Sequence, residues 1–182
     1  MNRRSALKSF LYVSAGISLL PACLQDKGKA SFLLKNIQVS GEQEKMLAEL
    51  CETIIPKTST PGAKDLSSHL FVLMMVDDCY KKEDQQTFVA GLKAFEEGVT
   101  QRYNTTFAGC SPTQKAELLS ALEQQLKQKK DTPAKPEAGF YGITKRLTIQ
   151  SFTSSEYYLT KVQVYQLVPG PVYKGCVPVN KA

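Results

Sequence analysis

The sequence of 182 residues contains a single histidine, His69. No second histidine, and no cysteine or glutamate at metal-ligand spacing, accompanies it, so we expect no metal site around this residue. His69 stands at the start of the most apolar stretch of the chain. A structural histidine with its hydrogen bonds satisfied is a better interpretation there than a general base.

Other signatures of chemistry are also missing from the sequence. No glycine-rich loop follows a predicted strand, which excludes a nucleotide-binding fold. No Cys-x-x-Cys-His segment occurs, which excludes covalent haem. Asp77 and Asp78 form a carboxylate pair, but adjacent helical residues point about 100° apart and do not easily share one substrate. We interpret them as solvated helix-end acids and predict no catalytic, cofactor-binding or metal-binding residue in this chain.

Nucleic-acid recognition has no signature here either. There is no zinc-finger spacing and no basic run interleaved with aromatic residues. The lysines of 127–130 lie at a predicted helix C-terminus, where cations suit the helix dipole. Removing residues 1–22, which hold three basic residues and no acid, lowers the formal charge from +6 to +3. Half of the positive charge therefore belongs to the leader, and we expect no nucleic-acid partner.

The first 22 residues have the pattern of an export signal. Arg3 and Arg4 precede an uncharged apolar run over 10–20, which spans only ~16 Å as a helix against the ~30 Å core of a bilayer. This run fits a signal-peptide core, and the twin arginines predict the Tat route, which carries folded cargo. We expect the mature protein in the periplasm.

The signal ends in Leu20-Pro21-Ala22-Cys23, which resembles a lipobox. Acylation of Cys23 would make it the mature N-terminus and anchor the protein in a membrane. Pro21 is unusual in such a site, and cleavage after Ala30 is an alternative that would leave a soluble periplasmic protein. We assign 1–22 to the signal, 23–38 to a tether and 39–182 to one domain, with folding expected to begin near Phe32.

Beyond the tether the sequence predicts an all-α bundle with an extended C-terminal tail. Ser40 to Gln43 and Ser111 to Gln114 read as capping boxes. Apolar residues recur at helical spacing after each box and through 88–103, and Pro56 ends the first helix. The run 70–76 is apolar all round, so its helix either crosses the domain centre or has its outer face covered by a partner. A loop over 131–139 and two shorter helices over 140–152 and 155–165 complete the bundle.

The segment 144–179 carries four of the eight tyrosines and ends in a stretch rich in proline and glycine, which cannot continue a helix. From about residue 167 the tail either lies along another protein or packs back on its own helices. With Cys23 assigned to lipid, Cys51, Cys79, Cys110 and Cys176 remain as disulfide candidates with three pairings. Cys51 and Cys79 lie in consecutive helices and could face each other. Cys176 could instead reach a partner chain, although internal pairing is favoured.

These residues together resemble the gluconate 2-dehydrogenase subunit 3 family. The likeness runs from about Ser40 to Val179 and is carried by Ile54 to Ala63, His69, Asp78-Cys79, Thr144 to Gln150, Ser155 to Tyr158, Pro169-Gly170-Pro171 and Gly175 to Val179. The resemblance implies a non-catalytic small subunit of a periplasmic, FAD-dependent sugar or sugar-acid dehydrogenase. In that family a large subunit of the glucose-methanol-choline type holds the FAD, and a cytochrome c subunit sometimes takes the electrons.

The resemblance also implies that the small subunit escorts the large one through Tat export and stabilises it. The lipobox is a departure, because many relatives have a plain signal, and it implies anchoring through this subunit. For partner contact we predict the turn formers Pro61 and Gly62 together with aromatic and tail positions, namely Tyr157, Tyr158, Tyr165, Pro169, Gly170, Pro171, Tyr173 and Cys176. The alternative is an independent periplasmic lipoprotein that binds a small molecule.

Overall fold

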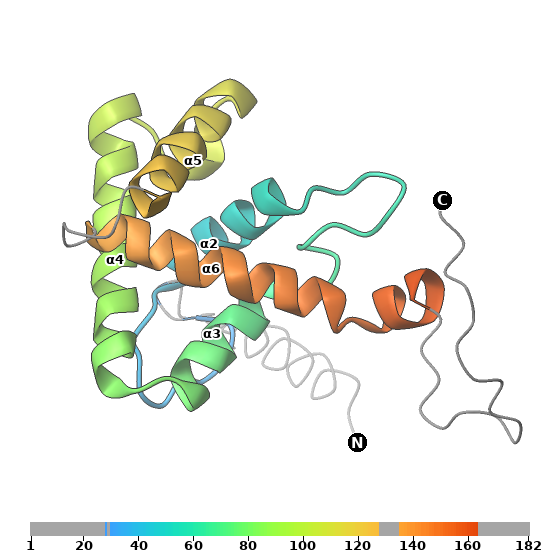
Figure 1. Cartoon of the computed structure of the whole chain (residues 1–182). Helices are drawn as coiled ribbons and strands as arrows, with labels where there is room; N and C mark the ends of the chain where they lie inside the picture. The colour runs from blue at the N-terminus through green and yellow to red at the C-terminus, as the bar shows by residue number, and fades with distance from the viewer. Residues whose placement is uncertain (1–27, 29, 128–134, 164–182) are drawn as a thin grey trace, which may run out of the picture.

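The computed structural model describes residues 28, 30–127 and 135–163, and this part of the chain contains helices and no strand. Five α-helices are α2 (Gly41–Ile54), α3 (Ser68–Cys79), α4 (Lys82–Tyr103), α5 (Pro112–Lys127) and α6 (Pro136–Thr153). Two short elements are the 3₁₀ turn η1 (Phe107–Gly109) and the π-helical turn η2 (Tyr158–Val162). The predicted all-α class is confirmed (Figure 1). None of the described helices is both long and apolar enough to span a bilayer.

Both predicted capping boxes form. The Gln43 amide donates to Ser40 Oγ (3.1 Å) while the Ser40 amide donates to Gln43 Oε1 (3.1 Å), and this pair starts α2. Ser111 and Gln114 make the same exchange before α5, at 2.8 and 3.2 Å. Each box satisfies two of the amides that a helix N-terminus leaves without internal partners.

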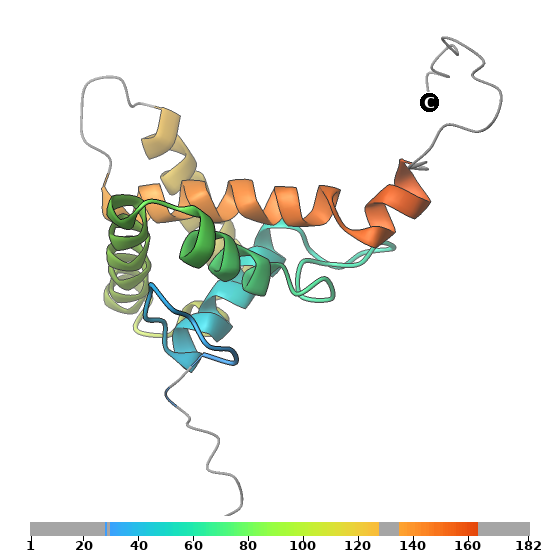
Figure 2. The same cartoon turned by 90° about the horizontal axis from the view of Figure 1, so that it is seen from below.

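Helix α6 is the element around which the others pack (Figures 1 and 2). Its Phe140 is fully buried, with the ring 5.1 Å from Phe88 and 5.6 Å from Phe95, both of α4. Gly91 of α4 lies opposite, where a Cβ atom would stand 2.3 Å from the Pro136 carbonyl oxygen. The absence of a side chain at Gly91 thus lets the two helices approach closely.

Helix α6 begins earlier than predicted. Residues 136–139 of the expected loop over 131–139 are helical, because Pro136 occupies the first helical position, where its missing N–H costs nothing. Gly139, interpreted as a loop residue, lies inside the helix. After Thr153 a turn leads to a second helical segment over 156–162, which ends in η2, so the predicted helix over 155–165 forms in part; residues 164 and 165 lie outside the described part.

Helix α3 lies at the surface and does not run through the domain centre. Val72, Leu73 and Val76 are fully buried, whereas Met74 on the opposite side is 51% exposed. Leu70, Phe71 and Met75 are half-buried. The continuous apolar run thus fills the core on one side only.

Asp77 is not a solvated helix-end acid, which corrects the prediction. It is 4% exposed, and its carboxylate accepts hydrogen bonds from the amides of Lys35 (2.9 Å), Asn36 (2.7 Å) and Ile37 (2.9 Å). Burial works against ionisation, but the three N–H donors and the charge of Lys35 outweigh it and hold the pKa of Asp77 below its usual value. Asp78, its neighbour, is exposed.

Further contacts show that the tether assigned to 23–38 extends too far along the chain, whereas the expected start of folding near Phe32 agrees with them. Ser31 donates from its amide and from its hydroxyl (2.6 Å) to the carboxylate of Glu44, which is 9% exposed. Ile37 and Val39 are buried in the core, and Phe32 and Leu34 pack against it. Residues 30–39, which we call the N-terminal loop, therefore belong to the folded domain.

Candidate functional site

The C-terminal end of α6 and the turn η2 extend beyond the body of the bundle (Figure 2). We call residues 149–163 the arm. Ile149 is 43% exposed and Val162 is 53% exposed, so the arm presents two of the large apolar side chains that the described structure leaves in solvent. An apolar, projecting helix end offers a partner protein surface that the domain's own core does not use.

A run of hydroxyl residues bends the chain between α6 and η2. The Ser154 hydroxyl donates to the Gln150 carbonyl (2.7 Å) and the Ser155 hydroxyl to the Phe152 carbonyl (2.7 Å). The Tyr158 amide in turn donates to Ser155 Oγ (3.2 Å), which starts the next turn. Such side-chain bonds compete with the helical ladder and end it locally.

The predicted contact residues Tyr157 and Tyr158 lie in the arm and are half-buried. The Tyr158 ring packs edge-on against Phe152, with centroids 5.7 Å apart and planes at 62°. Neither tyrosine belongs to the cluster that forms the main core. Each keeps part of its ring available at the surface of the arm.

The turn between α2 and α3 lies beside the C-terminal half of α6 in both views (Figures 1 and 2). Glu52 organises it, because its carboxylate accepts from the amides of Lys57 (2.9 Å) and Lys64 (2.8 Å). Gly62 is buried under that carboxylate, and an added Cβ would lie 2.5 Å from Glu52 Oε1. Gly62 thus shapes the turn, while Pro61 is half-buried.

Helix α3 begins without a side-chain cap. Ser67 occupies the cap position at a left-handed φ of 51° and makes no side-chain cap bond. Asp65 instead accepts from the Gly62 amide (3.1 Å) and pairs with Lys57 (3.1 Å), and these two contacts lower the pKa of its carboxyl. The acid holds the turn closed.

His69 differs from the satisfied histidine that we expected. Its Nδ1 is buried without a hydrogen-bond partner, and its Nε2 lies 3.8 Å from Glu44 Oε1. Burial lowers the pKa of the imidazole, although the Glu44 charge opposes that effect. Within residues 28, 30–127 and 135–163, no group of three or more His, Cys, Asp and Glu side chains could hold a metal ion.

The cysteines do not pair as the helix order suggested. Cys51 is fully buried, accepts a hydrogen bond from the Thr148 hydroxyl of α6 (3.3 Å) and has its pKa raised to about 11, chiefly by burial. Cys79 is exposed at the end of α3, and Cys110 is buried, so these three described cysteines are free thiols. The pairing of Cys51 with Cys79 is therefore wrong, because Cys51 faces α6.

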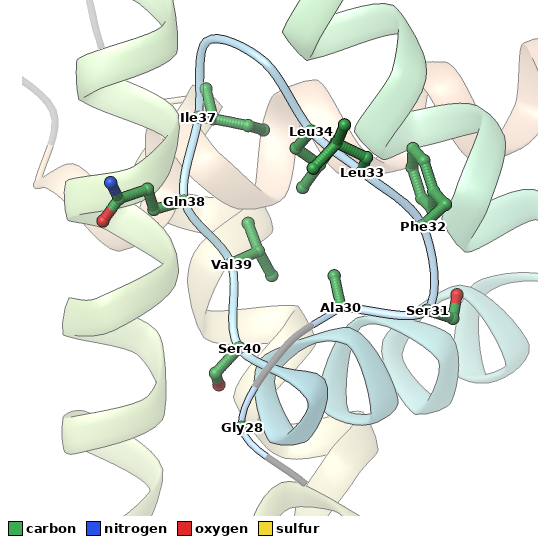
Figure 3. A pocket seen from close by; sticks show the side chains of 10 residues that line it. All are labelled: Gly28, Ala30, Ser31, Phe32, Leu33, Leu34, Ile37, Gln38, Val39 and Ser40. Atoms are coloured by element: carbon green, nitrogen blue, oxygen red, sulfur yellow. The ribbon is translucent and has the colours of Figure 1, made fainter. Parts of the chain in front are cut away.

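The N-terminal loop encloses a second feature, a cavity of about 720 Å³ (Figure 3). Apolar side chains supply much of its lining, including those of Phe32, Leu34, Ile37 and Val39, and the described lining residues include no acidic or basic side chain. Sequence analysis placed the start of folding near Phe32 but did not predict this cavity. The apolar trio Phe32-Leu33-Leu34 inside a polar stretch was the available signal.

A comparison with protein-family models matches residues 41–170 to "Gluconate 2-dehydrogenase subunit 3". The chain belongs to this family. The match covers most of the chain and includes α2 through η2, so the family resemblance seen in the sequence is confirmed. No curated protein and no solved structure gives a significant match.

Membership in the gluconate 2-dehydrogenase subunit 3 family makes this chain one subunit of a dehydrogenase complex. The arm and the turn lie inside the matched range, whereas the N-terminal loop precedes it. The predicted positions Arg3, Arg4, Cys23, Tyr165, Pro169, Gly170, Pro171, Tyr173 and Cys176 lie outside the described residues.

Proposed function

We propose that this chain is the non-catalytic small subunit of a periplasmic FAD-dependent dehydrogenase of the glucose-methanol-choline type that oxidises a sugar or sugar acid. It escorts the catalytic subunit through Tat export by means of Arg3 and Arg4, stabilises it, and anchors it through acylated Cys23. FAD is held by the large subunit, and a cytochrome c subunit is a further partner. The observation that carries the proposal is the family match over 41–170.

The arm is the surface that we assign to the catalytic subunit. Ile149 and Val162 are exposed apolar residues there, and Tyr157 and Tyr158 are half-buried aromatics of the kind enriched at protein interfaces. The tail that follows the arm in the sequence carries the remaining predicted contact residues. Arm and tail thus form one continuous stretch for partner contact.

Co-expression with the catalytic subunit tests the escort role. Export and flavin-dependent activity of the large subunit should be lost when this chain is omitted and restored when it returns. Full export and activity of the large subunit without this chain would rule out the escort role.

A double variant, Ile149→Ser with Val162→Ser, tests the arm. We expect helix content to be unchanged, because both side chains are surface-exposed, and co-purification of the flavin-containing subunit to fall at least tenfold. Leu33→Ser is the control, since Leu33 is also an exposed apolar residue but lies in the N-terminal loop. Wild-type recovery of the partner with the double variant would place the contact elsewhere.

The cavity of the N-terminal loop favours a second candidate, a lipoprotein that binds a small apolar molecule on its own. Its volume of about 720 Å³ is within the range of ligand pockets. This candidate predicts saturable binding of an apolar fluorescent probe by the isolated chain, with loss of binding in Val39→Trp, which would fill the cavity.

A further inference from the structure

Leu33 is the most exposed large apolar residue that the structure describes, at 88%. It lies in the N-terminal loop between two fixed points, the bonds of Ser31 to Glu44 and the bonds of Lys35, Asn36 and Ile37 to Asp77. These bonds hold the backbone on both sides of Leu33. Leu33 is therefore exposed in an ordered loop, and fraying of a chain end does not explain its exposure.

A cationic groove lies on the other side of the same loop. Its volume is about 560 Å³, and residues of the loop and of the N-terminal half of α4 line it. Three of the described lining residues are lysines, namely Lys35, Lys82 and Lys93, and no described residue of the lining is an aspartate or glutamate. Within the described residues, these lysines form no ion pair, unlike Lys57 and Lys64 of the turn. The groove suits an anionic partner.

The two features share one strip of chain. Ile37 and Gln38 line both the cavity of the N-terminal loop and the cationic groove. Figure 3 shows the Gln38 side chain directed away from the cavity and toward α4. An exposed apolar side chain on the same loop as a lysine-lined groove is an arrangement by which peripheral proteins contact membranes. The apolar group enters the boundary of the acyl region while the ammonium groups stay with the lipid phosphates.

The position in the chain indicates the same partner. Cys23 precedes Leu33 by ten residues, so the two are at most ~35 Å apart even when the chain is fully extended. An acyl group on Cys23 would keep Leu33 close to the bilayer surface. The loop also precedes the range matched by the family model, which separates it from the surface assigned to the catalytic subunit.

We propose that the N-terminal loop, with Leu33 and the lysines at 35, 82 and 93, is a membrane-contact surface that binds anionic phospholipid. Leu33 enters the bilayer boundary, and the lysines bind the headgroup phosphates. This contact orients the domain so that α6 and the arm face away from the membrane; Figure 2 places the loop and α6 on opposite sides of the bundle.

Tryptophan fluorescence tests the contact, because the sequence contains no tryptophan. Leu33→Trp in the mature chain 23–182 carrying Cys23→Ser provides a single reporter without a lipid anchor. With vesicles of brominated phosphatidylcholine and phosphatidylglycerol, we expect a blue shift and quenching. The matched reporter Ile149→Trp, on α6, should show neither.

Charge variants complete the test. Replacing Lys35, Lys82 and Lys93 by Gln should weaken vesicle binding by about tenfold or more, since each lysine near an anionic surface contributes to attraction. Replacing Lys57, Lys64 and Lys161 by Gln removes the same charge from the turn and arm and should change binding less than twofold.

Equal quenching of the two reporters, or equal effects of the two lysine sets, would overturn the proposal. So would shielding of the Trp at position 33 from aqueous iodide by the catalytic subunit without vesicles, which would make the loop a protein interface. The vesicle measurement needs neither acylation nor a partner subunit. Its failure therefore leaves the proposed accessory function standing, and a failure of the escort experiment leaves this contact standing.

Discussion

At the scale of single residues, two neighbouring acids at the end of α3 have opposite roles. Asp77 binds three backbone amides and is buried, whereas Asp78 is exposed. Gln85 adds to the arrangement by donating to the Asp77 carbonyl (2.8 Å) and the Val76 carbonyl (3.0 Å). The carboxylate of Asp77 is therefore the main polar link between the N-terminal loop and the helices.

Asp77→Ala should lower the free energy of unfolding by roughly 2–4 kcal/mol, because it leaves three amides of the loop without their acceptor. Asp78→Ala, one residue away, should change it by less than about 0.5 kcal/mol, as for most exposed positions. Urea unfolding followed by circular dichroism measures both. Equal effects of the two substitutions would contradict the role of Asp77 in holding the loop.

His69 provides a prediction on pH. Its folded-state pKa is lowered from the ordinary value of 6.5, mainly by burial, so the unfolded chain binds its proton more readily. The stability linked to His69 is complete above about pH 6.5 and is lost as the pH falls through that value and then through the lower folded pKa. Urea unfolding at pH 7.5 and 5.5 should show a smaller loss for His69→Gln than for the wild type. An unchanged loss would assign the pH dependence to other groups.

At the scale of elements, the packing of α4 on α6 depends on one missing side chain. A Cβ on Gly91 would meet the Pro136 carbonyl oxygen at 2.3 Å and Phe140 Cβ at 2.6 Å. In the same helix, a Cβ on Gly98 would meet nothing within 4 Å. Alanine substitutions at the two glycines therefore distinguish the need for close helix packing at Gly91 from the general destabilisation that glycine causes in a helix.

Gly91→Ala should destabilise the domain by roughly 1–3 kcal/mol, because the backbone of α6 must shift to admit the methyl group. Gly98→Ala should stabilise it by roughly 0.5–1 kcal/mol, since alanine is the better helix former. Thermal unfolding of the two variants checks both signs. A stabilising Gly91→Ala would show that α4 and α6 are not in close contact at this point.

Elements that rest on local signals were predictable. The capping boxes at Ser40 and Ser111 need only residues within one helical turn. The apolar residues of 88–103 recur at helical spacing, and this spacing identifies the buried face of that helix. The start of α6 was misplaced because Pro136 and Gly139 are common in loops as well as at a helix start. The break between α6 and η2 agrees with the predicted gap between helices over 140–152 and 155–165, and hydroxyl side chains that bond to carbonyls form it.

At the scale of the whole molecule, the N-terminal loop decides where the domain begins. Residues 30–39 place Ile37 and Val39 in the core and give Asp77 and Glu44 their donors. The loop and the arm lie at different ends of the bundle (Figure 2). This arrangement leaves the proposed membrane contact and the proposed partner contact free to operate at the same time.

A chain that starts at Ala30 should unfold at nearly the same temperature as one that starts at Cys23. A chain that starts at Ser40 should lose roughly 4–8 kcal/mol, because two buried apolar side chains are removed and Asp77 stays buried without its amide donors. That is comparable with the total stability of a domain of this size. Similar melting temperatures for all three chains would show that the N-terminal loop is a tether and not part of the folded domain.

The sequence by itself determined the helical class, the order of most helices and the family, because helix caps and apolar periodicity are local and the family motifs are continuous stretches. The tertiary structure alone decided which acid is buried, which cysteines are apart and which apolar residues remain exposed. Asp77 meets its partners about 40 residues away in the chain, and Cys51 meets Thr148 across 97 residues. Such contacts depend on how the helices pack, and the residues that neighbour each partner in the sequence do not predict that packing.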